Sequence, residues 1–343
     1  MEYRFLGRTG LNISPICFGT VNFGNPLVEK NCKQLVACAL EEGINFFDTS
    51  NVYEGYGRWF GSSGGLGETI LGKALSGKRN QAVICTKLGN PNGPGPLDAG
   101  LSARHLLLEI ENSLRRLRTD WIDILLAHRM DPSIPAEDVW GVLDQLVRSG
   151  KVRCIGVSNW PSWLMAKSCE LSARYGWTRC SVSSPEYSLL NRQIELEHIS
   201  ACFNYRVGLM TYKGLMGGIL TGKYHRGQTD YTGTRAGKKK AWLTRMDSHL
   251  FDKLEILQKI ASRSGLSMTE YAVAWILRRP IISSVVLSFS NEKQLQTAVE
   301  ASAKIIPNED IEEIDQIFVP PKRPGGEQVM KWRSGWALDD QEF

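Results

Sequence analysis

The sequence lacks the features of an exported, membrane-spanning or zinc-binding protein. No apolar run approaches the roughly 20 residues that a membrane helix needs. Residues 1–10 have neither the basic segment nor the apolar segment of a secretion signal. The eight cysteines show no C-x-x-C spacing. We therefore expect a cytoplasmic protein with reduced thiols, no bound metal and no membrane association.

Concentrated charge is scarce as well. The net charge is +5 over 343 residues, and the basic residues are scattered apart from the lysine run in residues 237–240. A solvated loop explains this run better than a nucleic-acid surface does, so no nucleic-acid partner is expected. With 42% hydrophobic residues, the chain can bury a large core.

What the chain does contain is a regular alternation of strand-like and helix-like segments. Apolar residues at three- and four-residue spacing predict helices over 103–118, 136–150 and 268–279. No linker divides the chain, and no G-x-G-x-x-G motif follows the first strand, which argues against doubly wound domains. We predict an α/β fold in which residues 1–343 form one (β/α)8 TIM barrel domain with large rim loops. An N-terminal β-hairpin around the turn at 8–10 is predicted to close the barrel floor. The expected barrel strands lie near 16–19, 44–47, 82–86, 122–126, 153–157, 179–183, 207–212 and 282–287.

Three successive predicted strands each end in an ionisable residue: Asp48, Lys87 and His128. Tyr53 follows the first of these strands by five positions. The carboxyl ends of parallel barrel strands share one face, so we expect these side chains to meet there. A carboxylate would keep the lysine charged, and the ammonium would lower the pKa of the tyrosine. The histidine would donate a hydrogen bond to a carbonyl oxygen, and the group as a whole suits proton transfer.

Around these residues the sequence resembles the aldo-keto reductase superfamily, over nearly the whole chain. The resemblance implies a barrel that binds NADPH, or alternatively NADH, and reduces an aldehyde or ketone by hydride transfer. The same site could run in reverse as an alcohol dehydrogenase. Tyr53 would be the acid, Lys87 and Asp48 would tune it, and His128 would orient the substrate. The matching segments are 43–53, 83–89, 113–128, 146–159, 186–192 and 220–224.

The resemblance also assigns a cofactor groove. Ser158 and Asn159 match the pair that holds the nicotinamide carboxamide, and short polar side chains suit that task. Tyr212 matches the aromatic residue that stacks on the nicotinamide ring. Near the adenosine phosphate, at a helix start that favours anions, the matching residues are Ser288, Ser290 and Gln294. The remaining predicted cofactor positions are Gly19, Thr20, Asp48, Ser184, Lys213, Gly214, Leu215 and Lys223.

Several departures from the family pattern leave the choice between NADP and NAD open. Ser184 stands where relatives carry a glutamine that binds the carboxamide. Lys213, in a Tyr-Lys-Gly-Leu segment, replaces a serine beside the pyrophosphate path. Ser288 and Ala298 replace a glycine and an asparagine, and the basic residue often associated with NADP preference is absent. We expect Lys213 to contact the pyrophosphate and to offset the amide lost at Ser184.

The loops over the rim should set substrate selectivity. Their aromatic residues suggest a pocket for a bulky or ring-bearing carbonyl, although packing within the loops explains them equally well. The long basic loop 225–250 is expected to close over the cofactor phosphates. The candidate substrate residues are Phe23, Trp59, Phe60 and Arg129, with Trp332 and Trp336 in the tail.

The resemblance leaves a second class of function open. Barrels of this superfamily also occur as ancillary subunits of potassium channels, in which the bound nicotinamide acts as a sensor. The loop 128–138 is compatible with that branch. Nothing in the sequence indicates a docking tail, and the expected partner is a small carbonyl or alcohol. The oligomeric state stays undetermined.

Overall fold

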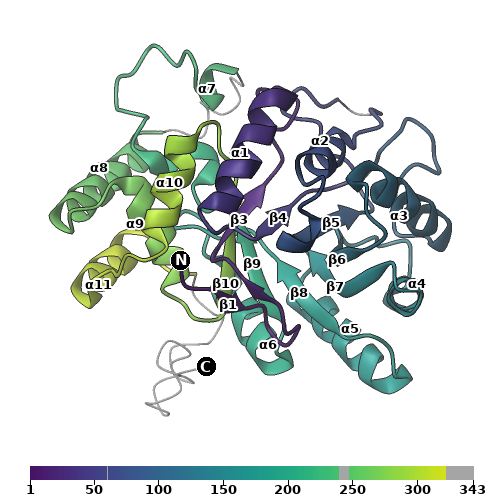
Figure 1. Ribbon diagram of the computed structural model, residues 1–343. Helices are drawn as coiled ribbons and strands as arrows, with labels where there is room; N and C mark the ends of the chain where they lie inside the picture. The colour runs from purple at the N-terminus through teal and green to yellow at the C-terminus, as the bar shows by residue number, and fades with distance from the viewer. Residues whose placement is uncertain (60, 239–246, 322–343) are drawn as a thin grey trace, which may run out of the picture.

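The computed structural model describes residues 1–59, 61–238 and 247–321. Eight parallel strands close into a barrel in the order β10-β3-β4-β5-β6-β7-β8-β9, with helices around it (Figure 1). The predicted (β/α)8 barrel and its eight strands are confirmed. The strands are β3 (Ile16–Gly19), β4 (Phe46–Asp48), β5 (Val83–Leu88), β6 (Ile122–Ala127), β7 (Val152–Ser158), β8 (Cys180–Ser184), β9 (Gly208–Tyr212) and β10 (Ile282–Leu287).

Most of the helices form because one side of each is apolar, whereas the helix Met268–Leu277 is buried on nearly all sides. In α3, Leu106, Ile110, Leu114 and Leu117 are buried, and the Ser102 side chain caps the first turn. The α-helices are α1 (Glu29–Glu41), α2 (Leu66–Ala74), α3 (Ala103–Leu117), α4 (Ala136–Arg148), α5 (Ser162–Tyr175), α6 (His198–Tyr205), α7 (Arg235–Lys238), α8 (Ser248–Arg263), α9 (Met268–Leu277), α10 (Glu292–Ala301) and α11 (Asn308–Ile317). Short 3-10 turns are η1 (Arg79–Gln81), η2 (Gln193–Glu195) and η3 (Met216–Thr221).

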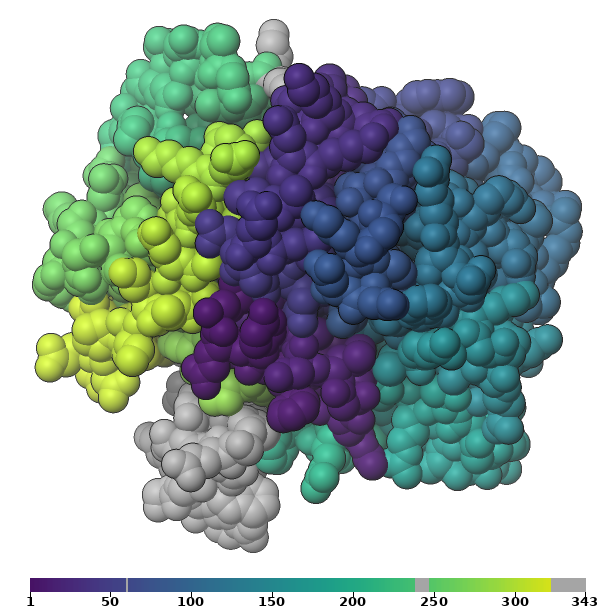
Figure 2. All heavy atoms as spheres, in the orientation of Figure 1, coloured from purple at the N-terminus to yellow at the C-terminus, as the bar shows by residue number. Residues whose placement is uncertain are grey.

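Barrel closure brings the two ends of the fold together. Strand β10 pairs with β3 in parallel, with Val285 opposite Ile16 and Leu287 opposite Phe18. In the space-filling view, the N-terminal segment in purple lies beside the C-terminal helices in yellow (Figure 2). The first strand of the barrel therefore takes up its position only when the last strand is in place beside it.

The predicted N-terminal hairpin is present and lies at the barrel floor. Strands β1 (Arg4–Phe5) and β2 (Asn12–Ile13) pair antiparallel. Leu6 and Ile13 are fully buried. At Gly7, with φ +53°, an added Cβ would lie 2.4 Å from the Gly208 nitrogen, so only glycine fits this turn. Both buried hairpin side chains belong to a cluster with Cys17, Phe46, Cys85, Ile124, Leu126, Val182 and Met210.

The described residues contain no helix that is long and apolar enough to cross a membrane. Nor do they contain a group of three or more His, Cys, Asp or Glu arranged to hold a metal ion. All eight cysteines lie in the described part of the chain and are free thiols.

The N-terminal hairpin, whose Leu6 and Ile13 are buried at the barrel floor, generates a stability prediction. Leu6→Ala should lower the free energy of unfolding by about 2 to 5 kcal/mol, because the apolar cluster closes only partly around the lost side chain. Phe5→Ala is the matched control, since the neighbouring Phe5 side chain is 69% exposed. Denaturant unfolding of the two variants makes the comparison. Equal losses in both would show that the hairpin does not plug the barrel.

Candidate active site

The predicted catalytic residues lie together at the carboxyl ends of three adjacent strands. Asp48 is the last residue of β4, Lys87 lies one residue before the end of β5, and His128 follows β6 directly. All three are at most 8% exposed. Tyr53 lies on the loop after β4, where its carbonyl accepts a hydrogen bond of 2.7 Å from the Gly67 amide at the start of α2. Parallel strand pairing therefore brings residues 80 positions apart in the sequence into one site.

The Lys87 ammonium is the centre of this site. Its Nζ lies 2.6 Å from Asp48 Oδ1, 2.8 Å from the Thr49 carbonyl oxygen and 3.3 Å from the Tyr53 hydroxyl. An ammonium has three N–H donors, and each one has a partner here. Burial alone would lower the pKa of Lys87, but attraction to Asp48, Tyr53 and Cys85 outweighs it and raises that pKa. Burial raises the pKa of Asp48, and the Lys87 ammonium opposes that shift.

The acidity of Tyr53 differs from the sequence expectation. Burial of the hydroxyl raises the pKa of Tyr53, and the Asp48 carboxylate adds to the rise. Lys87 lowers this pKa, as predicted, but its effect is smaller than that of burial. The net pKa is above the ordinary tyrosine value rather than below it. Tyr53 is therefore a protonated phenol near neutral pH.

His128 is held from two sides. Its Nδ1 lies 3.1 Å from Ser50 Oγ, and its backbone carbonyl accepts a hydrogen bond of 3.1 Å from Asn159 Nδ2. The imidazole ring stands edge-on to the Tyr53 ring, with 6.0 Å between ring centroids. The histidine and the tyrosine thus face the same space above the strands.

The electrostatic surroundings keep His128 neutral. Burial lowers the pKa of His128 well below the usual histidine value, and the positive charges of Lys87, Arg129 and Arg58 lower it further. A neutral imidazole carries one N–H, which can donate a single hydrogen bond to a ligand. This agrees with the predicted role of His128 as a donor to a carbonyl oxygen.

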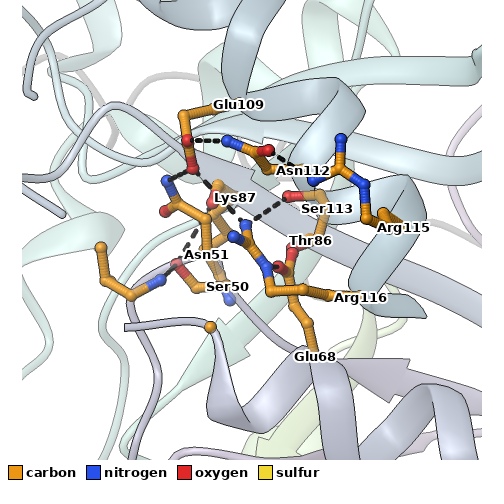
Figure 3. Close-up of polar contacts among 12 residues, drawn as sticks. Ser50, Asn51, Glu68, Thr86, Lys87, Glu109, Asn112, Ser113, Arg115 and Arg116 are labelled. Atoms are coloured by element: carbon orange, nitrogen blue, oxygen red, sulfur yellow. Dashed lines mark hydrogen bonds and ion pairs between the residues drawn. The ribbon is translucent and has the colours of Figure 1, made fainter. Parts of the chain in front are cut away.

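A second polar network anchors the same strand ends from outside the barrel (Figure 3). Glu68 accepts hydrogen bonds of 2.6 Å from Thr86 Oγ1 and from Arg116 Nε. Glu109 accepts from Asn51 Nδ2 at 3.0 Å and from Arg116 at 3.4 Å. Thr86 precedes Lys87 and Asn51 follows Ser50, so the network holds side chains on both sides of the site.

The sequence analysis missed this outer network. Glu68 and Glu109 lie in α2 and α3 and are buried, at 0% and 4% exposed. The sequence did contain a signal for Glu109, since this residue lies on the same helical face as the apolar residues Leu106 and Ile110. That position predicts a buried carboxylate. A carboxylate on the buried face of a helix requires a cationic or hydrogen-bonding partner.

The residues predicted to hold the nicotinamide carboxamide are brought together. Ser158 Oγ donates to the Ser184 carbonyl at 3.0 Å, and Asn159 Nδ2 lies 3.0 Å from Ser158 Oγ. The Tyr212 hydroxyl donates to Asn159 Oδ1. Asn159 takes a left-handed conformation with φ +58°, which turns its side chain back to the His128 carbonyl. These residues form one connected polar patch beside His128.

Besides the hydroxyl groups of Thr49 and Thr211, two buried hydroxyl groups near the strand ends have no hydrogen-bond partner among the described residues: Ser184 Oγ and Thr20 Oγ1. A buried hydroxyl without a partner costs free energy. Both are predicted cofactor residues, and both lie at the carboxyl ends of barrel strands. Their unused hydrogen-bonding capacity fits a polar ligand that binds at this face.

The predicted adenosine-phosphate residues gather at the start of α10. A Cβ added to Gly19 would lie 3.0 Å from Ser288 Oγ, so the small residue makes room for that loop. Gln294 Oε1 accepts a hydrogen bond of 2.8 Å from the Ser290 amide, and the Gln294 amide donates to Asn291 Oδ1 at 3.0 Å. Two backbone donors of this helix start are thus occupied by the chain's own side chains.

Lys213 is placed differently from the expectation. Its ammonium forms an ion pair with Glu186, so its positive charge is neutralised rather than free to face a pyrophosphate. The backbone of Lys213 is left-handed, with φ +59°. The next residue, Gly214, is required for packing, since an added Cβ would lie 2.8 Å from Ile276 Cδ1. Leu215 packs partly buried against the hydrophobic core.

The segment after β9 reaches across the barrel mouth. The Arg235 guanidinium in α7 lies 4.8 Å from the ring centroid of Tyr56, which belongs to the loop after β4. The pKa of Lys223 is lowered by burial and by the nearby Arg235. In Figure 1 this segment stands at the end of the molecule opposite the hairpin. Arg235 was missed in the sequence analysis, where only its place in a long basic loop marked it.

The candidate substrate residues do not form one group. Trp59 is 67% exposed, and Arg129 is exposed beside His128. Phe23 is fully buried, with its ring edge-on to Phe18 at 5.9 Å, so it lies in the core rather than on an open rim. Phe60, Trp332 and Trp336 lie outside the described residues, as do Lys239 and Lys240.

Fold and site together define a class of protein. A closed parallel barrel with a buried Asp-Lys-Tyr group and a neutral histidine at its strand ends is a barrel oxidoreductase site for carbonyl and alcohol chemistry. The chain belongs to the aldo/keto reductase family, whose sequence model matches residues 15–318. It is an NAD(P)H-dependent oxidoreductase.

Curated relatives cover nearly the whole chain. An uncharacterized oxidoreductase, YrpG of Bacillus subtilis, is 33% identical over 95% of this chain and 98% of its own length. A probable voltage-gated potassium channel subunit beta of Arabidopsis thaliana is 32% identical over 94% of this chain and 99% of its own. The L-glyceraldehyde 3-phosphate reductase of Escherichia coli O157:H7 is 30% identical over 92% of both chains.

The lowered pKa of His128 predicts a pH dependence of stability. Below about pH 6.5 the unfolded chain binds a proton at this histidine that the folded chain does not bind, so stability falls as the pH drops. His128→Gln should therefore lose less stability than the native chain on acidification to about pH 5, by about 2 kcal/mol. Denaturant unfolding at about pH 7 and at about pH 5 measures this difference. His225→Gln is the control, because His225 is exposed. Parallel losses in the native chain and His128→Gln would contradict a buried neutral His128.

Proposed function

We propose that this protein reduces an aldehyde or ketone, with hydride supplied by NAD(P)H and the proton supplied by Tyr53. One observation carries the proposal: a single ammonium, that of Lys87, contacts both the Asp48 carboxylate and the Tyr53 hydroxyl. That arrangement prepares a phenol to lose its proton. In the reverse direction the same residues would oxidise an alcohol.

The roles of the side chains follow from their charge states. Tyr53 is protonated near neutral pH, so a proton is available for the carbonyl oxygen. Lys87 then stabilises the phenolate that remains, and Asp48 keeps the ammonium in place. His128, as a neutral donor, orients the carbonyl oxygen toward the tyrosine. Each contribution is strongest in the transition state, where negative charge develops on the oxygen.

The cofactor-binding residues are proposed from their hydrogen bonds and their place beside the strand ends. A bound nicotinamide supplies the hydride. Its carboxamide would meet Asn159 and Ser158, and the unpartnered Ser184 hydroxyl would complete the set. Tyr212 lies beside this patch and would cover the ring. Toward the phosphates, the residues that would contribute are Gly19, Thr20, Gly214, Leu215, Lys223, Ser288, Ser290 and Gln294, while Lys213 would stay paired with Glu186.

NADPH is the proposed cofactor, with NADH as the alternative. Lys223 and Arg235 are close enough that their positive charges affect each other, and the segment that bears them crosses the barrel mouth. Two adjacent cations repel, and an anion placed between them relieves that repulsion. This favours a lid role for the segment over the phosphates of a dinucleotide.

A second function is supported by the relatives. Proteins named as potassium channel beta subunits match 92–94% of this chain, and the oxidoreductase-named relatives match 92–95% of it. Under this alternative the bound nicotinamide would act as a sensor, and turnover would be slow. Absorbance assays with NADPH and with NADH, against aldehydes, quinones, keto-sugars and cyclic ketones, separate the two functions. Cofactor binding without consumption of any carbonyl would favour the sensor.

The proposed acid generates a kinetic prediction. Tyr53→Phe should lower kcat by about 100-fold or more and leave cofactor affinity nearly unchanged, because the proton moves only in the transition state. Lys87→Met should have a similar effect and should also shift the kinetic pKa of the acid upward. Steady-state rates across pH, with fluorescence titration of NADPH, provide both readouts. More than about a tenth of the native kcat in Tyr53→Phe would exclude the tyrosine as the acid.

The ion pair at Lys213 generates a second prediction. With Glu186 present, Lys213→Ala should weaken NADPH binding by less than about threefold, since the pair neutralises the lysine. In a Glu186→Gln background the same change should cost about tenfold at low salt, and less at high salt. Calorimetric titration of the single and double variants gives the coupling. A tenfold loss with Glu186 in place would mean that the lysine leaves its partner for the cofactor.

A further inference from the structure

Ser50 is a buried residue that neither the family resemblance nor the proposed mechanism assigns. It lies on the loop after β4, between Thr49, whose carbonyl oxygen binds Lys87, and Asn51, whose side chain is anchored to Glu109. It is 0% exposed. A side chain fixed on both sides by such contacts is preorganised, and whatever it contacts is held in a defined position.

The Ser50 hydroxyl lies within hydrogen-bond distance of two groups. Its oxygen lies 3.1 Å from His128 Nδ1 and 3.2 Å from the Lys87 carbonyl oxygen. A hydroxyl has only one proton, so it can donate to one of these at a time. The Lys87 carbonyl already accepts a hydrogen bond of 3.2 Å from the Asn51 amide. His128 Nδ1 has no other partner in the described part of the chain.

The neutral state of His128 makes this choice matter. A neutral imidazole has one N–H, on either Nδ1 or Nε2. If Nδ1 carries the proton and donates to Ser50, then Nε2 has only a lone pair and repels a carbonyl oxygen. If Ser50 donates to Nδ1, then Nε2 carries the proton and can bind that oxygen. Only the second arrangement serves reduction.

We propose that Ser50 is a positioning residue that selects the Nε2–H tautomer of His128 by donating its hydroxyl proton to Nδ1. This inference rests on the proposed reductase function. Hydrogen bonds to the far nitrogen commonly set which nitrogen of a functional histidine is protonated. Ser50 itself touches neither substrate nor cofactor and acts through His128.

The chain offers a matched control in His198. Its Nδ1 lies 3.1 Å from Ser162 Oγ, the same separation as in the Ser50 pair, and its Nε2 lies 2.9 Å from Ser183 Oγ. These buried serine–histidine contacts join α6 to α5 and to β8 and lie outside the proposed catalytic site. Ser162→Ala therefore removes a similar contact without altering His128.

The direct test is nitrogen-15 NMR of the histidine side chains, which distinguishes the two tautomers. His128 is assigned by the signal that His128→Gln removes. We expect the Nε2–H form in the native protein, with NADP⁺ present and absent, and in Ser50→Thr, which keeps a hydroxyl. In Ser50→Ala the ratio of tautomers should shift by about three- to tenfold, the effect of one neutral hydrogen bond. An Nδ1–H form in the native protein, or an unchanged ratio in Ser50→Ala, would overturn the proposal.

Kinetics provide the second readout. Ser50→Ala should lower kcat/KM for a carbonyl by about three- to tenfold and leave the dissociation constant of NADPH unchanged, with recovery in Ser50→Thr. Ser162→Ala should reduce thermal stability only. A loss of stability in Ser50→Ala with unchanged kcat/KM would make the serine merely structural. If the native protein reduces no carbonyl, the proposed function fails, while the tautomer in the native spectrum still decides the role of Ser50. If Ser50→Ala does not fold, an Nδ1–H form in the native spectrum still overturns the proposed role of Ser50.

Discussion

An ammonium buried at the mouth of a barrel is the constraint around which this site is built. Removing the Lys87 ammonium from water costs several kcal/mol of desolvation free energy. An ion pair offsets that cost only if every N–H donor finds a partner. Asp48 supplies one acceptor from the neighbouring strand and the Thr49 carbonyl supplies another, so the chain must turn inward directly after β4. That turn carries Ser50 toward His128 and brings Tyr53 within 3.3 Å of the ammonium. The positions of Tyr53, the proposed proton donor, and of Ser50, the partner of His128, thus follow from the requirements of Lys87.

The barrel wall at this point is supported on both sides. Inside, Cys17, Phe46 and Cys85 fill the space that leads down to the hairpin side chains. Outside, Glu68 and Glu109 with Arg116 hold the side chains of Thr86 and Asn51, which flank Lys87 and Ser50. Figure 3 shows this outer network beside Ser50 and Lys87. Polar networks of this kind are stabilising only when every member is satisfied, and here they also restrict the motion of the strand ends.

How much of this could be predicted depended on whether the determining signal was local. Strand composition and helical periodicity are local, so all eight strands, the floor hairpin and the grouping of Asp48, Lys87 and His128 followed from the sequence. The charge of Lys213 was equally visible, but its partner Glu186 lies 27 positions away and meets it only because β8 and β9 are neighbours. Phe23 looked like a rim residue because an aromatic near a strand end reveals nothing about the direction of its ring. The raised pKa of Tyr53 depends on burial, which three-dimensional packing decides.

The hairpin that plugs the floor also governs the order in which the chain can fold. Its buried residues, Leu6 and Ile13, share a cluster with Val182 and Met210, and Arg4 donates a hydrogen bond to the carbonyl of Ile282, 278 positions later. These N-terminal residues therefore find their partners only after the much later segments of the chain exist. Closing so long a loop lowers the conformational entropy of the chain before the stabilising contacts can form. This slows folding. During synthesis β3 precedes its last partner, β10, by most of the chain, since Ile16 pairs with Val285. Until β10 arrives, an unpaired β3 edge remains exposed, and such edges promote association between incomplete chains.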